Sequence, residues 1–199
     1  MKIMAVYSKE PKADSVGRSM LVWPDSALVR SGKPVFMPEY ESGCVIAVAT
    51  GVRVDRLGKS IRKRFSYRYY NEVAPMAFVL SRRNFDSLIS LDGRGPEEYV
   101  ADYSVICGDF IEKNLLRSPS IWSLRISDLS SRHRSSTDTE MLGLEERLDE
   151  TIEYASKCNT LKTGDLVAAI DFTLSTPVER NCRLELAIDD VSLLNVKLK

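Results

Sequence analysis

The chain has 199 residues, of which 44% are hydrophobic and 28% are charged, as is ordinary for a soluble globular protein. This length is enough for one sizeable core, and we expect a single domain over residues 1–199. Lys and Arg number 28, and so do Asp and Glu, which makes the formal net charge zero. That balance disfavours a dedicated nucleic-acid or acidic-membrane binder, whose affinity would depend on excess positive charge.

The sequence also carries signals about its compartment. No apolar run reaches the ~20 residues that a membrane span needs, and Met1–Ser8 meets Lys9 and Glu10 too soon for a signal peptide. The cysteines are scattered, with no Cys-x-x-Cys pair, at Cys44, Cys107, Cys158 and Cys182. With His133 as the single histidine, in a polar loop, zinc ligation is disfavoured. We therefore expect a reduced, cytoplasmic chain.

In chain order, apolar runs typical of buried strands recur through the first two thirds. They cover residues 2–7, 44–49, 74–80, 103–107 and 122–126. After the first run, a polar loop is expected over 8–19, and turn residues flank the short segment 27–29. Gly93 and Gly95 lie in an exposed loop over 91–96. Because no Lys-Ser or Lys-Thr follows them, the phosphate-loop signal is very weak.

Residues 53–68 carry seven basic residues, with Asp55 as the only acid. One interpretation is a nucleic-acid or phosphate patch. The other is the solvated face of a short helix that opens at Ser60, with Ile61 and Phe65 turned inward. The zero net charge favours the helix face, and nucleic-acid binding is the weaker hypothesis.

The clearest helix follows, because apolar residues recur every three or four positions at Leu144, Leu148, Ile152 and Ala155. It should end near residues 158–159, with a polar residue at 136–138 (Ser136, Thr137 or Asp138) as its cap.

Three further strands are predicted at the end of the chain, over 165–172, 183–188 and 191–198. The last two alternate apolar and polar residues around Asp189 and Asp190, which predicts a hairpin with one wet face. Many strands and few helices indicate an α+β, β-rich fold.

Between the helix and the hairpin lies Leu-Lys-Thr-Gly-Asp-Leu-Val, residues 161–167, which resembles the closing segment of the fumarylacetoacetate hydrolase family. Further landmarks of that family follow in the same order, at residues 24–28, 32–34, 40–41, 56–59 and 64–70. The resemblance implies a mixed β-roll of the type of the family's C-terminal domain, usually dimeric, with a magnesium-type ion. Active members cleave C–C bonds in acylpyruvate-like diketo acids, decarboxylate, or isomerise.

The family's metal positions are largely lost. In the family, a Glu-x-Glu pair and a later Asp hold the ion; the resemblance places them at Glu41, Gly43 and Phe78. One remaining carboxylate does not hold Mg²⁺ strongly against its hydration shell. We therefore expect no cofactor, with Glu41 as the only retained ligand position; the alternative is a site for Mg²⁺ or Mn²⁺.

The reactive positions depart in the same way. Where the family has a lysine before Pro-Asp-Ser, this chain has Trp23. A second family lysine aligns near Tyr99, with Asp102 remaining from its neighbourhood. The family's Thr-Gly-Thr-Pro loop becomes residues 169–172, which include Asp171. We expect a degenerate pocket without catalytic residues, more apolar than in the family, in which Trp23 or Tyr99 helps Phe78 to fill the space.

Three functions stay open. The first is a non-catalytic member of the fold that acts as a binding or regulatory subunit, in a homodimer or in a heterodimer with an active relative. The second is a metal-dependent hydrolase or decarboxylase of acylpyruvate or other diketo-acid substrates, with two displaced acids converging on Glu41. Those acids would come from Glu39, Asp86, Asp102, Asp109 and Asp171. The third is a nucleic-acid-binding module through Arg53–Arg68. The residues at positions 43 and 78 favour the first.

Overall fold

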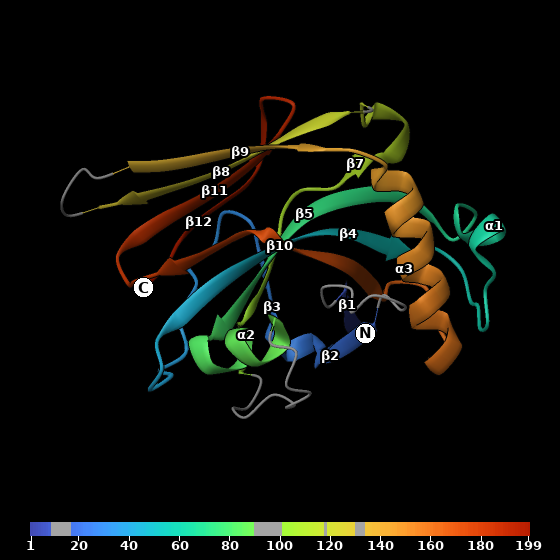
Figure 1. Ribbon diagram of the computed structural model, residues 1–199, viewed down its shortest axis with the longest axis horizontal. Helices are drawn as coiled ribbons and strands as arrows, with labels where there is room; N and C mark the ends of the chain where they lie inside the picture. The colour runs from blue at the N-terminus through green and yellow to red at the C-terminus, as the bar shows by residue number, and fades with distance from the viewer. Residues whose placement is uncertain (9–16, 90–100, 118, 130–133) are drawn as a thin grey trace.

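The computed structural model describes the chain except for residues 9–16, 90–100, 118 and 130–133. The described residues form an eight-stranded sheet and a four-stranded sheet, with three α-helices at their margins (Figure 1). The β-rich α+β class expected from the sequence is confirmed.

The larger sheet has the strand order β2-β1-β10-β4-β5-β6-β3, and β7 pairs with β5 off this path. Its strands are β1 (Lys2–Ser8), β2 (Arg18–Pro24), β3 (Leu28–Arg30), β4 (Cys44–Val54), β5 (Tyr70–Ser81), β6 (Val105–Cys107), β7 (Ile111–Glu112) and β10 (Leu166–Val178). The sheet is mixed, because β1 runs parallel to β10 and β3 runs parallel to β6, while the other pairs are antiparallel.

The two ends of this strand order lie close together. Strands β2 and β3 are the outermost members, yet only the three-residue 3₁₀ turn η1 (Asp25–Ala27) separates them in the chain. Three residues span at most about 10 Å, so the sheet has to curl until its edges approach each other. The result is a roll, as the mixed β-roll of the sequence prediction requires.

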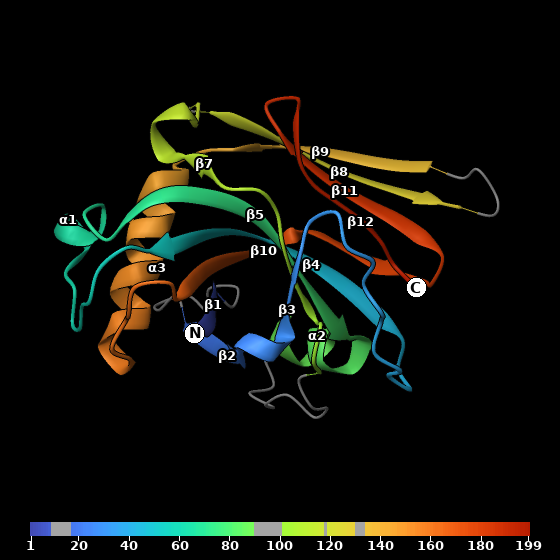
Figure 2. The ribbon, with the colours of Figure 1, turned by 180° about the vertical axis from the view of Figure 1, so that it is seen from behind.

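The smaller sheet is wholly antiparallel and has the order β12-β11-β8-β9. Its strands are β8 (Ser120–Asp128), β9 (Arg134–Met141), β11 (Cys182–Ile188) and β12 (Val191–Lys197). It lies across the outside of the roll (Figure 2). The predicted terminal hairpin is confirmed as β11 and β12, and its turn residues Asp189 and Asp190 both have positive φ, as a tight hairpin turn requires.

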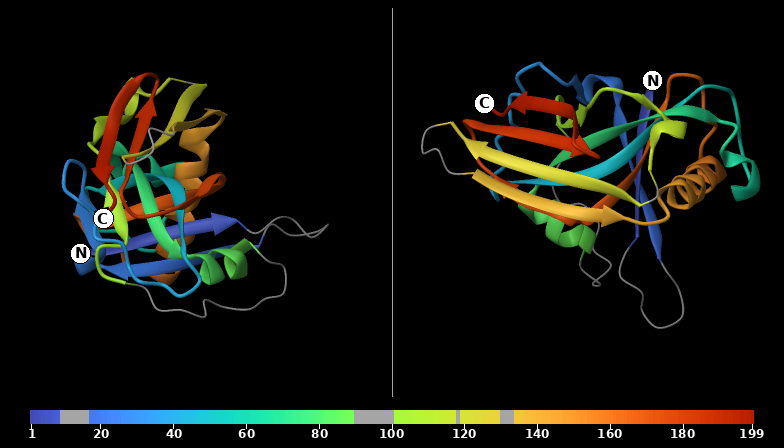
Figure 3. Two further views of the ribbon diagram at one scale, coloured as in Figure 1. Left: turned by 90° about the vertical axis from the view of Figure 1, so that its left-hand side faces the viewer. Right: turned by 90° about the horizontal axis from the view of Figure 1, so that it is seen from above.

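The helices lie at the ends of the roll. They are α1 (Lys63–Ser66), α2 (Arg82–Ile89) and α3 (Leu144–Cys158), and a second 3₁₀ turn, η2, covers Lys113–Leu115. Helix α3 packs on β10, β1 and β4 (Figure 3). No helix in the described part of the chain has the length and apolar character to cross a membrane.

Two separate apolar cores result. The inter-sheet core lies between the roll, the smaller sheet and α3, and contains Val48, Trp122, Leu148 and Leu184. The roll core lies on the opposite, concave face of the larger sheet. Its buried members come from that sheet, from η1 and from α2: Ile3, Ala5, Tyr7, Trp23, Ala27, Ala47, Ala49, Ala74, Met76, Phe78, Leu80, Leu88, Val105, Cys107, Leu166, Ala168 and Ile170.

Three details of the sequence prediction are wrong. Residues 18–24 form β2 rather than the end of a loop and a turn, because each pairs with a residue of β1. Residues 136–138 do not cap α3. They belong to β9, and their backbone pairs with β8 instead. Helix α3 instead begins after Gly143, whose φ is 61°, without a side-chain cap.

The short helix predicted to open at Ser60 begins later than expected. Ser60 has a φ of 52°, which is incompatible with a right-handed helix, so α1 starts only at Lys63. Ile61 is buried as predicted, whereas Phe65 remains 37% exposed. The inward residue of this turn is Ser66.

Candidate functional site

An aromatic pair occupies the roll core. Trp23 from β2 and Phe78 from β5 have ring centroids 4.9 Å apart with an interplanar angle of 47°. Both are fully buried, with 1% and 0% exposure. The structure thus brings together two of the residues that the resemblance places in the family's pocket.

Small side chains make room for this pair. Alanines from β1, β4, β5 and β10 line the same interior, at Ala5, Ala47, Ala49, Ala74 and Ala168. Ala47 is the direct cross-strand partner of Phe78. Because protein cores pack at near-crystalline density, small side chains opposite the two large rings are what such packing requires. The described residues of this interior are predominantly apolar.

A second set of rings extends this apolar lining. Phe172 on β10 packs edge-on against Tyr7, at 5.7 Å, and against Phe85 of α2, at 5.6 Å. Burial raises the pKa of the Tyr7 hydroxyl and, deeper in the core, raises the pKa of the Cys107 thiol to about 11. Both groups therefore stay neutral at physiological pH.

Glu41 and Gly43 lie outside this core, in the turn before β4. Glu41 is exposed, and Gly43 has a φ of 81°, a conformation that favours glycine. The Gly43 N–H donates to the Tyr40 carbonyl at 3.1 Å, and its own carbonyl accepts from the Arg82 N–H at 2.9 Å. The glycine at this position is thus explained by the turn that leads into β4.

The same turn forms one wall of an open cleft of about 720 Å³, which the end of β10 completes. The carboxylates of Glu39, Glu41 and Glu179 line it, together with Arg180. Arg180 donates to Glu39 at 2.8 Å, and this hydrogen bond lowers the pKa of that carboxyl group. One of the three acids is therefore already neutralised by an arginine.

Asp171 has a structural partner. It sits where the β10–β4 register shifts, between residues 171 and 176. Arg147 of α3 donates to its carboxylate and to the Ile170 carbonyl, each at 2.6 Å, and Thr173 donates to Asp171 through its backbone and hydroxyl. Burial opposes ionisation of Asp171, but these hydrogen bonds outweigh it and lower its pKa. The cluster fixes the bulge to α3.

Asp102 is also engaged elsewhere, because it accepts a hydrogen bond from the Ser26 hydroxyl at 2.6 Å. Tyr99 and His133 lie outside the described residues. Glu41 is exposed while Phe78 is sealed in the roll core, so the structure does not bring the matched metal positions together as ligands. In the described ranges, no three His, Cys, Asp or Glu residues are grouped so as to hold a metal ion.

The donor set therefore does not fit the divalent cation that the resemblance implies. Mg²⁺ and Mn²⁺ require several oxygen ligands around one point. The indole of Trp23, the benzyl group of Phe78 and the hydrogen at Gly43 supply none. Glu41 remains the single oxygen donor of the set.

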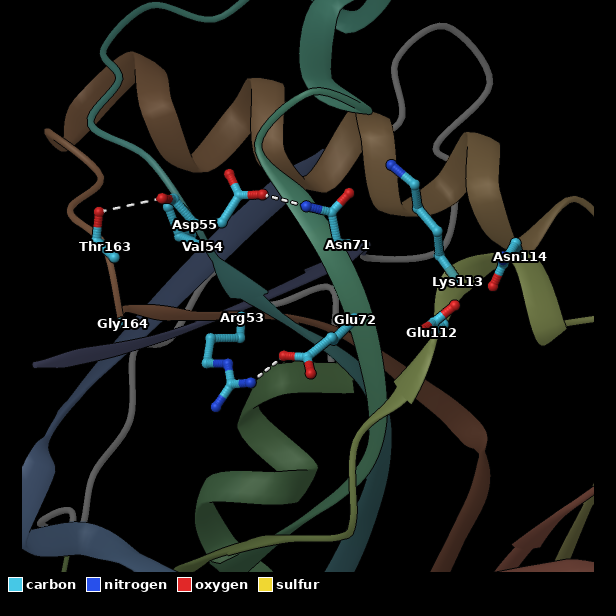
Figure 4. A pocket seen from close by; sticks show the side chains of 10 residues that line it. All are labelled: Arg53, Val54, Asp55, Asn71, Glu72, Glu112, Lys113, Asn114, Thr163 and Gly164. Atoms are coloured by element: carbon cyan, nitrogen blue, oxygen red, sulfur yellow. Dashed lines mark hydrogen bonds and ion pairs between the residues drawn. The ribbon is translucent and has the colours of Figure 1, made fainter.

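A polar cleft at the other end of β4 and β5 was not anticipated from the sequence. It has a volume of about 770 Å³, and Figure 4 shows the side chains that line it. Its acidic and basic lining residues are Arg53, Asp55, Glu72, Glu112 and Lys113. The available signal is the set of charged residues from Arg53 to Glu72, between the apolar runs at 44–49 and 74–80.

Several side chains that line this polar cleft form ion pairs or hydrogen bonds with neighbouring residues. Arg53 forms an ion pair with Glu72 and lies over the Phe110 ring at 4.8 Å. The Asn71 amide donates to Asp55 at 2.6 Å. The Lys113 ammonium donates to the carbonyls of Tyr67 and Tyr70 at 2.6 and 2.8 Å.

Glu112 differs from these paired groups. It is exposed, and it stands directly opposite Glu72 across the β5–β7 pair, where like charges repel. The polar cleft thus offers both signs of charge and hydrogen-bonding groups, without a nucleophile held against a base. This arrangement is suited to binding a polar molecule.

The basic segment 53–68 is partly neutralised in the fold. Arg53 pairs with Glu72, Arg56 contacts Asp55 at 3.1 Å, and Lys63 reaches Glu146 and Glu150 of α3 at 2.5 and 2.8 Å. Three of the seven basic side chains therefore have acidic partners. A phosphate backbone would have to compete with those carboxylates.

A curled mixed sheet with a four-stranded antiparallel sheet across its outside is the fold of the fumarylacetoacetate hydrolase family, and this chain has that fold. A Yersinia pestis protein assigned to the family is similar with a TM-score of 0.75 and 17% identity, over 100% of this chain and 92% of that one. Fumarylpyruvate hydrolase from Pseudomonas aeruginosa, solved with Mn²⁺ and pyruvate, matches with a TM-score of 0.74 and 17% identity, over 100% and 89%.

A further similar structure is 5-carboxymethyl-2-hydroxymuconate delta-isomerase from Mycobacterium smegmatis, with a TM-score of 0.74 and 16% identity, over 99% of this chain and 76% of that one. No family model matches the sequence, and no curated protein matches it significantly. At these identities the similarity establishes the fold alone.

Proposed function

We propose that this chain is a non-catalytic member of the fumarylacetoacetate hydrolase fold that acts as a binding or regulatory subunit. The buried contact between Trp23 and Phe78 carries the proposal. The resemblance assigns these positions to the lysine that precedes the family's Pro-Asp-Ser and to a metal-binding aspartate. Two packed aromatic rings can replace neither side chain, and they occupy volume that a hydrated cation and a substrate would need.

The polar cleft is the surface that we propose for binding. Its volume of about 770 Å³ is in the range of small-molecule sites. Arg53 and Lys113 supply cationic groups, and Asp55, Glu72 and Glu112 supply anionic ones. None of the four cysteines forms a disulfide, which suits the reduced, cytoplasmic setting that we propose for this subunit.

Calorimetric titration with Mg²⁺ and Mn²⁺ tests the loss of the metal site. We expect no binding in the micromolar range, because Glu41 alone cannot replace the hydration shell. Titration of Glu41→Gln and of a matched control, Asp190→Asn, which removes an exposed carboxylate in the terminal turn, identifies any heat that comes from Glu41. A micromolar dissociation constant that Glu41→Gln abolishes and Asp190→Asn leaves intact would overturn the proposal.

The second candidate is a metal-dependent hydrolase or decarboxylase of acylpyruvate or related diketo acids. It is favoured by the Mn²⁺ and pyruvate bound to the fumarylpyruvate hydrolase of the same fold, and by the three glutamates around the 720 Å³ cleft. It requires turnover of acylpyruvates or oxaloacetate that a chelator abolishes and Glu41→Gln reduces strongly. Turnover at the buffer rate across that panel, with Mn²⁺ present, supports the non-catalytic proposal instead.

A further inference from the structure

The outer edge of the smaller sheet is formed by a strand whose residues are mostly exposed. Strand β9 is the last strand in the order β12-β11-β8-β9, and no described strand pairs with its outer side. Its eight residues pair with β8 without a register shift, and only Met141 is buried. An edge of this kind presents a row of unpaired N–H and C=O groups to any strand that can lie beside it.

Several of the usual protections of an edge strand are missing from β9, and its charged residues are the protection that remains. Natural edges are blunted by charged side chains, especially lysine, by proline, by a bulge or by a very short strand. A partner strand would therefore have to complement Arg134, Asp138 and Glu140. The segment Arg-Ser-Ser-Thr-Asp-Thr-Glu-Met has no proline or lysine, and its pairing with β8 has no bulge. Its serines and threonines suit a pleated strand whose two sides remain wet.

The strand is also complementary to itself. Consider antiparallel pairing of two copies of β9 about a twofold axis, with at least seven residues of each paired. Three registers are possible, centred on Thr137, between Thr137 and Asp138, or on Asp138. The first places Arg134 opposite Glu140 twice. The second places Arg134 opposite Met141, and the third places Asp138 opposite itself.

The charges of the first register lie on the accessible face. Trp122 and Leu124 of β8 point into the inter-sheet core, and their cross-strand partners are Thr139 and Thr137. Residues of the other parity, Arg134, Ser136, Asp138 and Glu140, therefore face away from the roll. In this register each Arg–Glu pair would lie on the outer face, with Ser136 opposite Asp138 between them.

An exposed apolar side chain adjoins each of these ion pairs. Ile121 of β8 is the cross-strand neighbour of Glu140 on that outer face and is 54% exposed. In the proposed dimer, Arg134 of the second copy would lie on the far side of Glu140 from Ile121, about 10 Å away across two strands. Leu142, directly after β9, is 74% exposed.

From these observations we infer that β9 is an assembly surface, which pairs antiparallel with β9 of a second copy about an axis through Thr137. The two four-stranded sheets then form one continuous sheet across the dimer. This interface includes no residue of the roll core or of the polar cleft. The proposed pairing of β9 therefore does not depend on whether the chain is catalytic.

Sedimentation equilibrium with charge-swapped variants tests the register. The full chain should be a dimer. Arg134→Glu and Glu140→Arg should each weaken its dissociation constant about tenfold or more, because each puts like charges opposite each other twice. The double variant should restore it. Arg183→Glu on β11 makes the same charge change at another exposed outer-face position, and should leave the dimer unchanged.

Crosslinking provides a second readout, in a background with the exposed Cys158 replaced by serine. In the proposed register, residue 137 faces its own copy with Cα atoms about 4.5–5.5 Å apart, within reach of a disulfide. Thr137→Cys should therefore give a covalent dimer on mild oxidation. Ser135→Cys should not, since its copy lies four residues along, about 13 Å away.

Three results would overturn the inference: a monomer throughout the dilution series, a dimer that neither charge reversal weakens, or equal crosslinking at 135 and 137. None of them bears on the metal titration, so failure of this interface and failure of the proposed function can be told apart.

Discussion

The two ends of β4 and β5 have opposite characters. At one end the strands face the roll core, where Phe78 packs on Trp23 among alanines. At the other end they carry Arg53 and Glu72 into an open polar cleft. Gly51 marks the boundary on β4: a Cβ there would lie 2.2 Å from the sulfur of Met76. The same two strands thus present packed apolar side chains at one end and exposed charged side chains at the other.

The largest effect is expected from Phe78→Ala. If the ring is structural, its removal leaves a cavity and lowers the free energy of unfolding by about 3–5 kcal/mol. Urea denaturation measures this loss, which should lower the melting temperature by ~10 °C. Phe36→Ala deletes the same group at a site that is 64% exposed and should cost less than about 1 kcal/mol. Equal losses for the two variants would contradict the comparison.

An intermediate effect is expected from Asp171→Asn. The lowered pKa of Asp171 in the folded state stabilises the fold above the carboxyl group's unfolded pKa, and this contribution is lost as pH falls through the folded pKa. The variant should lose about 1–2 kcal/mol at neutral pH. Its difference from the parent should shrink in acid.

Unfolding free energies measured in a pH series check this, with Asp190→Asn as the exposed control. A difference between Asp171→Asn and the parent that stayed constant down to strongly acidic pH would show that the carboxylate charge contributes nothing.

The smallest effect is expected from Glu72→Gln in the polar cleft. Its pair with Arg53 is solvent-exposed, and the variant also relieves repulsion from Glu112, so stability should change by less than about 1 kcal/mol. Chemical denaturation at low and high salt measures it. A loss approaching that of Phe78→Ala would mean that the rim is as structural as the interior.

Much of the roll could be predicted because its signals are local. The apolar runs at 44–49 and 74–80 became the central strands β4 and β5, which are buried on both faces. The contact between Trp23 and Phe78 was accessible only through the family resemblance, since the two residues lie on strands far apart in the sequence.

Two other features lack an apolar pattern that would have predicted them. Strand β9 is almost entirely polar, and it is a strand because β8, which precedes it in the chain, supplies its backbone partners. The polar cleft is lined by four separate segments: the end of β4, the start of β5, the β7–η2 segment and the turn at Thr163. Charged residues at the ends of predicted strands indicate an exposed edge of the sheet. They do not indicate which of these segments lie together in the fold.

The parallel pairing of β1 with β10 has a consequence for how the chain reaches its native state. Ile3 is in register with Leu166, a separation of 163 positions. During translation β1 is made long before β10, although its other neighbour, β2, follows soon after it. The high contact order of this pairing favours slow closure of the roll. Until then the apolar side of β1 is open to misassociation, so we expect the nascent chain to depend on chaperones more than its modest size suggests.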